Sequence, residues 1–389
     1  MNWPEISNKI REIDTPFYLY DTKGLDNHVK EMLRVLPDNF HVHYALKANN
    51  NPLVTKVIFE NGLGADCVSW GELQLAYNHQ IDPKKIVLAG VGKTDKEIIW
   101  GIQHQILSFN VESVHELKVI DSIAGSLSKP AHICIRLNPN IDAKTHKYIT
   151  TGLEENKFGI LWRDLPEVVD ILRNSNYLKF MGVHFHIGSQ ITDWFPFERL
   201  CVKANESLQY FRERNLEPKM LNVGGGLGID YHHPESTKVD FQKYFGIFEK
   251  FLEIPDNFPV HFELGRSITA NFGYLITRVL YIKKGFKTTF VIVDAGMTDL
   301  LRPSLYQAFH KIQNISSSST KKQTYDIVGP ICESSDTFLK NYELPETSRN
   351  DYLVIFSAGA YGEVMSSNYN MREKPSSVDL QQLLTSVKN

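Results

Sequence analysis

The chain has 389 residues, of which 42% are hydrophobic and 22% are charged, a length that predicts two or three domains with a sizeable core. Its formal net charge of −3 gives no electrostatic reason to expect nucleic acid or a membrane surface as partner, so a small molecule is the better expectation. The sequence shows no signal-peptide pattern and no uncharged run near the ~20 residues of a membrane span, which predicts a cytoplasmic protein. Its four cysteines are scattered without a C-x-x-C pair, so we expect them to be reduced thiols.

Short apolar runs alternate with amphipathic segments over the first two thirds of the chain. The apolar runs predict strands at residues 41–47, 64–68, 86–90, 107–111, 131–138, 180–187, 220–224 and 260–264. The amphipathic segments predict helices at residues 52–61, 70–79, 94–104, 112–122, 164–174 and 197–214. Such alternation indicates parallel strands joined by right-handed helical crossovers. Eight units over residues 23–265 predict an α/β fold, a (β/α)8 TIM barrel, whose usual size is ~250 residues.

Beyond residue 265 the apolar residues alternate at period two. This pattern predicts strands at residues 274–282, 288–294, 324–328 and 352–356, separated by glycine, proline and asparagine. We expect a C-terminal antiparallel β domain, joined by the lone apolar strand at residues 17–20. The predicted domains are therefore the barrel, residues 23–265, and a β domain made of residues 1–22 and 266–389.

Polar residues lie at the carboxyl ends of the predicted barrel strands, where active sites of this fold gather. They are Lys47, Asp66, Arg136, Asn138, His184, His186, Gly224, Gly225, Gly226, Glu263 and Arg266. A single polar residue at a strand end is usually a loop anchor, so the prediction depends on their convergence.

Lys47 ends an apolar segment and is the candidate nucleophile. A lysine amine reacts at neutral pH only when burial or a neighbouring cation lowers its pKa, whereas most lysines at strand ends are solvated. Gly224, Gly225 and Gly226 follow the seventh strand, and they indicate either an anion cradle or a tight turn, since neither a P-loop nor a G-x-G-x-x-G spacing is present.

His184 and His186 lie on one face of the sixth strand. They indicate either a metal pair or an imidazole that stacks on an aromatic cofactor, with Ser189 near the phosphate of that cofactor. The other strand ends offer lysine, arginine, glycine and glutamate, so no metal is expected. A lysine, an anion cradle, an imidazole and the carboxylate of Glu263 together predict a site for pyridoxal 5'-phosphate, with Lys47 as the point of covalent attachment and Glu263 on the ring nitrogen.

A series of ordered motifs between Phe17 and Arg372 resembles the diaminopimelate decarboxylase family, barrel-type (fold type III) pyridoxal-phosphate-dependent decarboxylases. The motifs are HYALKANNNP, GADCVSWGEL, HFHIGSQ, NVGGGLGIDY, ELGRS, DAGMTDLLRPSLY, GPICESSD and SAGAYGEVMSSNYN. The resemblance implies decarboxylation of meso-2,6-diaminopimelate to L-lysine and CO2, the last step of lysine biosynthesis, by a homodimer with shared active sites. Leu264 departs from the family, in which many members have proline.

The resemblance also implies a role for each matching residue. For the cofactor these residues are Lys47 (attachment), His186 (ring stacking), Glu263 (ring nitrogen) and, around the phosphate, Ser189, Gly224, Gly225, Gly226 and Tyr361. Gly265 and Arg266 are also implied as cofactor-binding residues. For the substrate they are Arg266, Arg302 and Tyr306 at the carboxylate that is not cleaved, Glu333 at the distal amine, and Tyr361. Cys332 is implied as proton donor, and with Glu333 it would come from the second subunit.

Two alternatives remain open. A decarboxylase of the same fold could act on ornithine, arginine or carboxynorspermidine, although Arg266 and Arg302 would then face a cationic tail. The chain could also be a non-catalytic cofactor-binding homologue, but such a protein should have lost Lys47 or Cys332.

Overall fold

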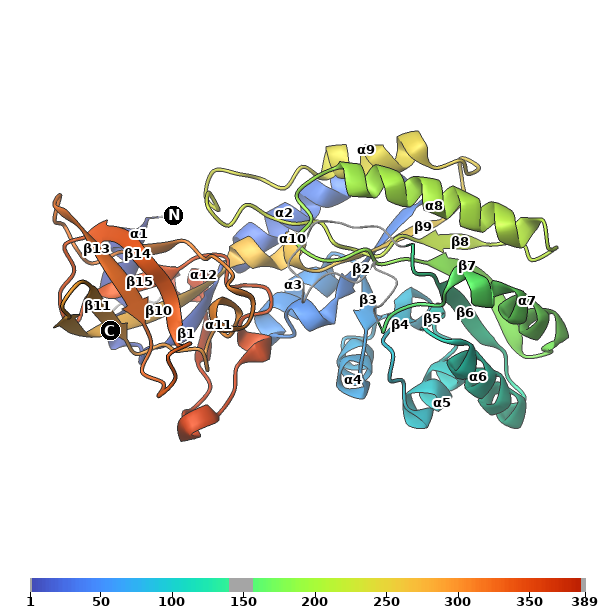
Figure 1. The fold of residues 1–389 in the computed structure, drawn as a ribbon, viewed down its shortest axis with the longest axis horizontal. Helices are drawn as coiled ribbons and strands as arrows, with labels where there is room; N and C mark the ends of the chain where they lie inside the picture. The colour runs from blue at the N-terminus through green and yellow to red at the C-terminus, as the bar shows by residue number, and fades with distance from the viewer. Residues whose placement is uncertain (1, 140–156, 386–389) are drawn as a thin grey trace.

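The structure is a computed structural model, and it describes residues 2–139 and 157–385. A closed barrel of eight parallel strands forms one half of the molecule (Figure 1). Its strands are β2 (Phe40–Ala45), β3 (Gly64–Cys67), β4 (Ile86–Leu88), β5 (Ser108–Val111), β6 (Ala131–Arg136), β7 (Leu178–His184), β8 (Met220–Asn222) and β9 (Val260–Leu264). Because β9 pairs with β2, the sheet has no free edge. The predicted barrel is confirmed, and each predicted strand overlaps an observed one. Several strands end two or three residues earlier than predicted, so Lys47 and His186 follow their strands and do not lie within them.

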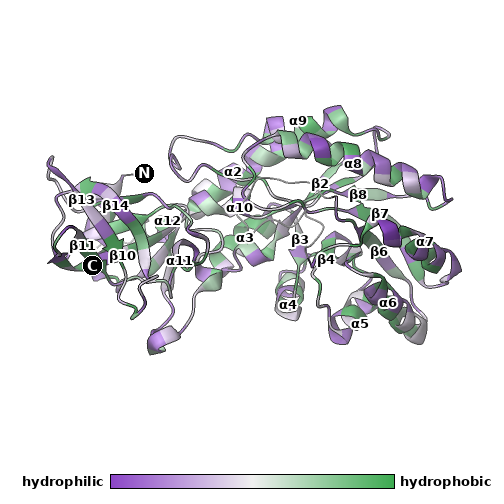
Figure 2. Cartoon of the chain, viewed as in Figure 1, coloured by the Kyte–Doolittle hydropathy of each residue, from purple (hydrophilic) through white to green (hydrophobic). Residues whose placement is uncertain are grey.

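Helices cover the outside of the barrel. They are α2 (Thr22–Arg34), α3 (Pro52–Glu60), α4 (Trp70–Asn78), α5 (Asp95–His104), α6 (Val114–Leu127), α7 (Leu165–Asn174), α8 (Phe195–Arg212) and α9 (Phe241–Phe251). Several begin at a side-chain cap, such as Thr94, which forms a reciprocal capping box with Glu97. Figure 2 shows hydrophobic and hydrophilic residues side by side along α8, as expected when one helix face packs on the strands.

The carboxyl end of the barrel interior carries a polar layer within an otherwise apolar core. Asn110, His184, Asn222 and Glu263 come from β5, β7, β8 and β9, and all four are buried. Buried polar groups are stable only when they are hydrogen-bonded, so this layer marks the end of the barrel at which a site can be built.

The second half of the molecule is a β-sheet to which both ends of the chain contribute. Its strands are β1 (Phe17–Tyr20), β10 (Gly273–Lys284), β11 (Thr289–Val293), β12 (Ile312–Asn314), β13 (Lys322–Val328), β14 (Thr337–Pro345), β15 (Tyr352–Ile355) and β16 (Ser376–Asp379). The order is β12-β15-β10-β11-β13-β14, and β1 pairs with β10 and β16. Most pairs are antiparallel as predicted, but β11 with β13 and β1 with β16 are parallel. The domain limits themselves stay a prediction.

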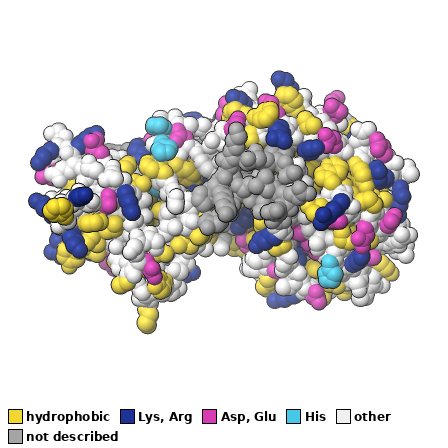
Figure 3. Space-filling view, in the orientation of Figure 1, with side chains coloured by type: hydrophobic (Ala, Val, Ile, Leu, Met, Phe, Trp, Pro, Cys, Tyr) yellow, Lys and Arg dark blue, Asp and Glu magenta, His cyan; other side chains and the backbone are white. Residues whose placement is uncertain are grey.

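The remaining α-helices of the described chain are short, and they are α1 (Trp3–Lys9), α10 (Arg266–Thr269), α11 (Arg302–Tyr306) and α12 (Leu380–Thr385). Within residues 2–139 and 157–385, no helix combines the length and apolar character needed to cross a membrane. Figure 3 shows acidic and basic side chains interspersed over the visible face, in keeping with the small net charge.

Candidate active site

Lys47 lies in a short 3-10 turn (Leu46–Ala48) directly after β2, and it reaches the neighbouring strand. Its Nζ donates a hydrogen bond of 2.7 Å to Oδ2 of Asp66 on β3. The Asp66 side chain is fully buried, while 34% of the Lys47 side chain remains exposed. Burial lowers the pKa of Lys47, but Asp66, Tyr361 and Glu263 outweigh it and hold the pKa above its ordinary value. The lowered pKa expected of a nucleophilic lysine is therefore not found, because two carboxylates lie near the amine.

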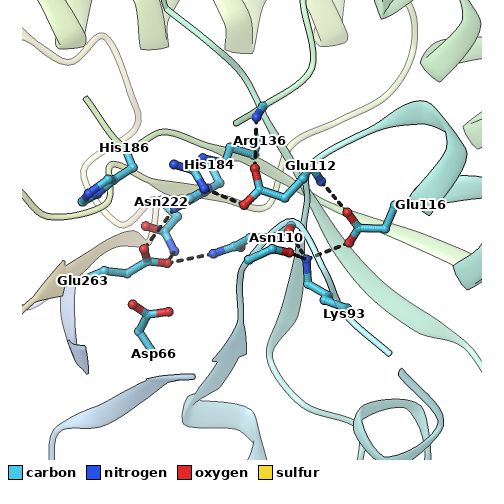
Figure 4. A network of polar contacts seen from close by, with 12 residues as sticks. Asp66, Lys93, Asn110, Glu112, Glu116, Arg136, His184, His186, Asn222 and Glu263 are labelled. Atoms are coloured by element: carbon cyan, nitrogen blue, oxygen red, sulfur yellow. Dashed lines mark hydrogen bonds and ion pairs between the residues drawn. The ribbon is translucent and has the colours of Figure 1, made fainter. Parts of the chain in front are cut away.

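Glu263 on β9 is a buried carboxylate with three donors (Figure 4). Its Oε1 accepts hydrogen bonds of 2.8 Å from the amides of Asn110 and Asn222, and its Oε2 accepts one of 3.1 Å from Nε2 of His184. Burial raises the pKa of Glu263, yet His184 and Lys47 pull it far below the usual range. The site therefore holds a permanent negative charge, which suits a protonated ring nitrogen.

Sequence reasoning gave no role to Asn110 and Asn222, and it offered His184 only as half of a possible metal pair. The available signal was weak: each is a polar residue inside an apolar strand run. Only the closed barrel brings them to Glu263, from which Asn110 is separated by 153 residues in the chain.

His186 follows β7 and differs from His184 in its surroundings. The backbone N–H of Gly225 donates to Nδ1 of His186 over 3.3 Å. Burial, with the positive charges of Arg136 and Lys47, holds the pKa of His186 well below its ordinary value. The imidazole is therefore neutral and can offer an uncharged flat face. In the described part of the chain, no three His, Cys, Asp or Glu side chains are arranged to hold a metal ion.

The glycines after β8 lie where three backbone segments pass closely. A Cβ on Gly224 would lie 2.1 Å from the carbonyl oxygen of Phe185, and one on Gly225 would lie 2.1 Å from that of Glu263. Gly224 and Gly226 also have φ angles of 69° and 109°, which side chains rarely adopt. The tight-turn interpretation thus explains these glycines by itself, and their contact with a phosphate stays a prediction.

Arg266 begins α10 immediately after Gly265, and its side chain contacts residues from distant segments of the chain. Its Nη2 donates to Oγ of Ser189 over 3.0 Å, and its Nη1 donates to the hydroxyl of Tyr231 over 2.7 Å. Its guanidinium lies 4.7 Å from the ring centre of Tyr361. The structure therefore brings Ser189, Arg266 and Tyr361 together, while their roles stay a prediction.

Tyr361 links this group to Lys47. Its backbone N–H donates to the carbonyl oxygen of Ala48 over 2.7 Å, which places a residue that follows β15 beside the turn that carries Lys47. The cofactor-attachment candidate and the anion-binding candidates therefore belong to one site.

Arg302 begins α11 and meets Arg266 at a shared neighbour that sequence reasoning missed, Tyr231. The Arg302 guanidinium lies 4.8 Å from the ring centre of Tyr231, and its Nη1 is 2.8 Å from Nε2 of His310. Tyr306 ends the same helix. Burial lowers the pKa of Arg266, but Tyr231, Tyr361 and Tyr306 outweigh burial and raise it, so Tyr306 also lies close to this group.

Cys332 and Glu333 are exposed and lie in the loop between β13 and β14. The Glu333 carboxylate accepts a hydrogen bond of 2.9 Å from Tyr369. Among the described residues, no hydrogen bond or ion pair joins either side chain to Lys47 or Arg302. In the described part of a single chain these two predicted residues are therefore not bonded to Lys47 or Arg302.

The site fits pyridoxal 5'-phosphate in its chemistry. It offers an amine, an ionised carboxylate, a neutral imidazole and a buried guanidinium, which match the aldehyde, ring nitrogen, ring face and phosphate of that cofactor. Asp66 Oδ1 and His184 Nδ1 are buried and lack a hydrogen-bond partner among the described atoms. Unsatisfied polar atoms beside Lys47 and Glu263 are expected where a ligand completes the site.

Comparisons with known proteins agree with this chemistry. The family described as "Pyridoxal-dependent decarboxylase, pyridoxal binding domain" matches residues 23–270. The chain is 48% identical over 371 residues to a diaminopimelate decarboxylase of Bacteroides thetaiotaomicron, covering 95% of this chain and 96% of that protein. A relative from Aquifex aeolicus with the same name is 43% identical, over 94% of this chain and 86% of its own.

Solved structures give the same result. The diaminopimelate decarboxylase of Helicobacter pylori, solved in complex with L-lysine, has a TM-score of 0.90 and 42% identity, over 96% of this chain and 93% of that one. The match covers the barrel and the β domain alike. This chain therefore belongs to the pyridoxal-dependent decarboxylase family.

Proposed function

We propose that this protein is a diaminopimelate decarboxylase, a carboxy-lyase that converts meso-2,6-diaminopimelate into L-lysine and CO2 with pyridoxal 5'-phosphate, as the last step of lysine biosynthesis. The observation that carries this function is the pair of buried guanidiniums, Arg266 and Arg302, which meet at Tyr231. The substrate has a carboxylate at each end, and only one leaves. A diamine product such as that of ornithine would instead place a cation against these groups.

Lys47, Glu263 and His186 are the residues we assign to the cofactor ring. Bound pyridoxal phosphate supplies an electron sink for the bond to the departing carboxylate. Lys47 holds the cofactor covalently through Nζ, and Asp66 keeps that amine at the mouth of the barrel. Glu263 stays ionised because of its three donors and keeps the ring nitrogen protonated, while neutral His186 covers the ring face.

Ser189 and Arg266 are the side chains we assign to the phosphate, with Tyr361 and the backbone of Gly224–Gly226 and Gly265. The Ser189 hydroxyl lies within 3.0 Å of Nη2 and 3.4 Å of Nε of Arg266, both of which donate to it. A hydroxyl whose oxygen accepts in this way keeps its own proton for an anion. Ser189 can therefore donate to a phosphate oxygen that Arg266 neutralises.

We assign Arg302, Tyr306, Arg266 and Tyr361 to the substrate carboxylate that is not cleaved. Bidentate binding by a guanidinium fixes which end of the diacid reaches the cofactor. Glu333 would read the distal amine, and Cys332 would deliver the proton that replaces CO2. Both side chains are exposed in one chain, which supports a homodimer in which each subunit contributes these two residues to the active site of the other.

A cytoplasmic location is part of the same proposal. All four cysteines are free thiols, and three of them are buried, as is usual in a reducing compartment.

The test is a comparison of substrates with the purified holoenzyme. Incubation with meso-diaminopimelate should release CO2 and L-lysine, while ornithine, arginine and carboxynorspermidine should release little CO2. Faster CO2 release from ornithine than from diaminopimelate would contradict the assignment of Arg302 and favour the diamine-producing alternative. No release from any substrate by fully loaded enzyme would favour a non-catalytic homologue.

A further inference from the structure

Arg302 is held by two residues that have no assigned role, His310 and Tyr231. The Arg302 side chain is almost completely buried, at 4% exposure. Its Nη1 donates to Nε2 of His310 over 2.8 Å, and its guanidinium lies 4.8 Å from the ring centre of Tyr231. These contacts come from the loop after α11 and from the loop between β8 and α9. Arg302 is thus fixed from two directions by separate parts of the chain.

The tautomer of His310 follows from its hydrogen bonds. Its Nδ1 lies 2.8 Å from the carbonyl oxygen of Phe356, which can only accept, so Nδ1 carries the proton. Nε2 is then a lone-pair acceptor directed at Arg302. Burial, the positive charge of Arg302 and that of Arg266 hold the pKa of His310 well below its ordinary value, so the ring stays neutral. His310 is therefore an acceptor with a fixed direction.

Tyr231 lies between two like charges. Its hydroxyl accepts from Nη1 of Arg266 over 2.7 Å, its ring face meets Arg302, and its ring makes an edge contact of 5.0 Å with His310. A phenol and a neutral imidazole orient guanidiniums through hydrogen bonds and ring contacts. Neither supplies a negative charge, so neither neutralises them.

The charges of Arg266 and Arg302 are left uncompensated. No carboxylate forms an ion pair with either guanidinium in residues 2–139 and 157–385, and Nε of Arg302 has no hydrogen-bond partner there. Buried charges are ordinarily paired, because an unpaired buried charge is strongly destabilising. Such a cost is expected where a ligand brings the missing negative charge.

We propose that His310 and Tyr231 are positioning residues that orient Arg302 without neutralising it, so that its charge is available to the substrate carboxylate that is not cleaved. An aspartate or glutamate at either place would orient Arg302 equally well but would compete with the substrate. This inference rests on the proposed function, because it needs a ligand with such a carboxylate.

The experiment compares two ligands that differ in that carboxylate alone. L-lysine retains it, whereas cadaverine has the same carbon chain and amines without it. Dissociation constants for both are measured by calorimetry with pyridoxal-phosphate-loaded wild type, His310→Ala, His310→Gln and Tyr231→Leu. His43→Ala is the matched control, since His43 is also buried, with Nδ1 on a backbone carbonyl and Nε2 on a side chain.

His310→Ala and Tyr231→Leu should each raise the dissociation constant of L-lysine by about tenfold or more, the usual effect of losing a hydrogen bond to a charged group. The dissociation constant of cadaverine should stay within about twofold of the wild-type value. His310→Gln should recover much of the affinity, because its amide oxygen can accept from Nη1. In turnover of diaminopimelate, the KM should rise more than kcat falls. His43→Ala should bind both ligands like the wild type.

An equal rise in the dissociation constants of L-lysine and cadaverine would overturn the inference, because it would show that His310 and Tyr231 have only a general structural role. Unchanged lysine binding in correctly folded His310→Ala, as judged by circular dichroism, would overturn it as well. In both cases wild-type turnover shows that the proposed function stands. A loaded wild type that neither binds L-lysine nor decarboxylates diaminopimelate would overturn the proposed function and this inference together.

Discussion

Lys47 Nζ and Asp66 Oδ2 are 2.7 Å apart, and this hydrogen bond joins the mouths of β2 and β3. Asp66 is itself unusual, because burial and the charge of Glu263 raise its pKa even though Lys47 opposes them. The contact places the amine correctly but also keeps it protonated. Capture of a carbonyl compound needs the neutral amine.

The first prediction follows from this conflict. Asp66→Asn removes the largest influence that raises the pKa of Lys47, so more of the amine is neutral at a given pH. The pH midpoint for covalent cofactor attachment to the apoenzyme, followed by absorbance, should therefore move to lower pH. Asp26→Asn is the control, because it removes a surface Lys–Asp contact of 2.6 Å with Lys30. An unchanged midpoint in Asp66→Asn would show that this contact does not govern attachment.

A second prediction concerns which lysine holds the cofactor. Lys93, labelled in Figure 4, is a second lysine near this end of the barrel, but its Nζ donates hydrogen bonds to Glu116 and to the carbonyl oxygens of Gly90 and Asn110, which uses all three of its donors. Borohydride reduction followed by peptide mass spectrometry should label Lys47. Lys47→Ala should abolish the label and the cofactor absorbance that it stabilises, whereas Lys93→Arg should retain both. A label that survives in Lys47→Ala would refute the assignment.

The sequence predicted the barrel well because its strands are buried on both faces and read as continuous apolar runs. Helix α9 was missed although Phe241, Tyr244, Phe245 and Phe248 form its buried face. Strands β12, β14 and β16 were missed because they are short or carry exposed polar residues, so no alternation of apolar residues marks them. They are extended because they pair with neighbouring strands in the sheet.

The residues of the candidate site also fall into a predictable group and a group that the sequence could not reveal. Residues at strand ends, such as Lys47 and Glu263, could be selected from the rule that barrel sites gather there. Asn222, Tyr231 and His310 could not, since each acts through contacts with segments that only the folded chain brings close. The shifted pKa of Lys47 depends on charges from other strands and was likewise invisible.

A third prediction tests the proposed dimer. Lys47→Ala and Cys332→Ala should each be inactive as pure proteins, because one lacks the attachment amine and the other the proposed proton donor. If each site combines Lys47 of one subunit with Cys332 of the other, a mixed dimer contains one site with both defects and one site with neither. Co-refolded or co-expressed variants should then regain a measurable fraction of wild-type CO2 release. No recovery, with mixed dimers demonstrated by differential tagging, would show that each site uses its own Cys332.

A fourth prediction concerns His43 in β2, which donates from Nδ1 to the carbonyl oxygen of Lys85 and accepts at Nε2 from Nδ1 of His261 over 2.8 Å. Burial lowers the pKa of His43 to about 4. In the unfolded chain its pKa is about 6.5, so between these values the unfolded state binds more protons than the folded state. The stability that neutral His43 contributes is therefore fully present above pH 6.5 and is lost as the pH falls toward 4.

Urea unfolding at pH 7 and pH 4.5 measures this contribution. A pKa difference of this size corresponds to about 2–3 kcal/mol lost from the free energy of unfolding over that interval. His43→Gln cannot take up the proton, so its loss between the two pH values should be smaller than that of the wild type by about this amount. His41 and His261, whose pKa values burial also lowers, remain in the variant and keep part of the pH dependence. His115→Gln, a change at an exposed histidine of α6, should follow the wild type. Equal losses in His43→Gln and the wild type would mean that His43 is protonated without cost in the folded protein, against its burial between Lys85 and His261.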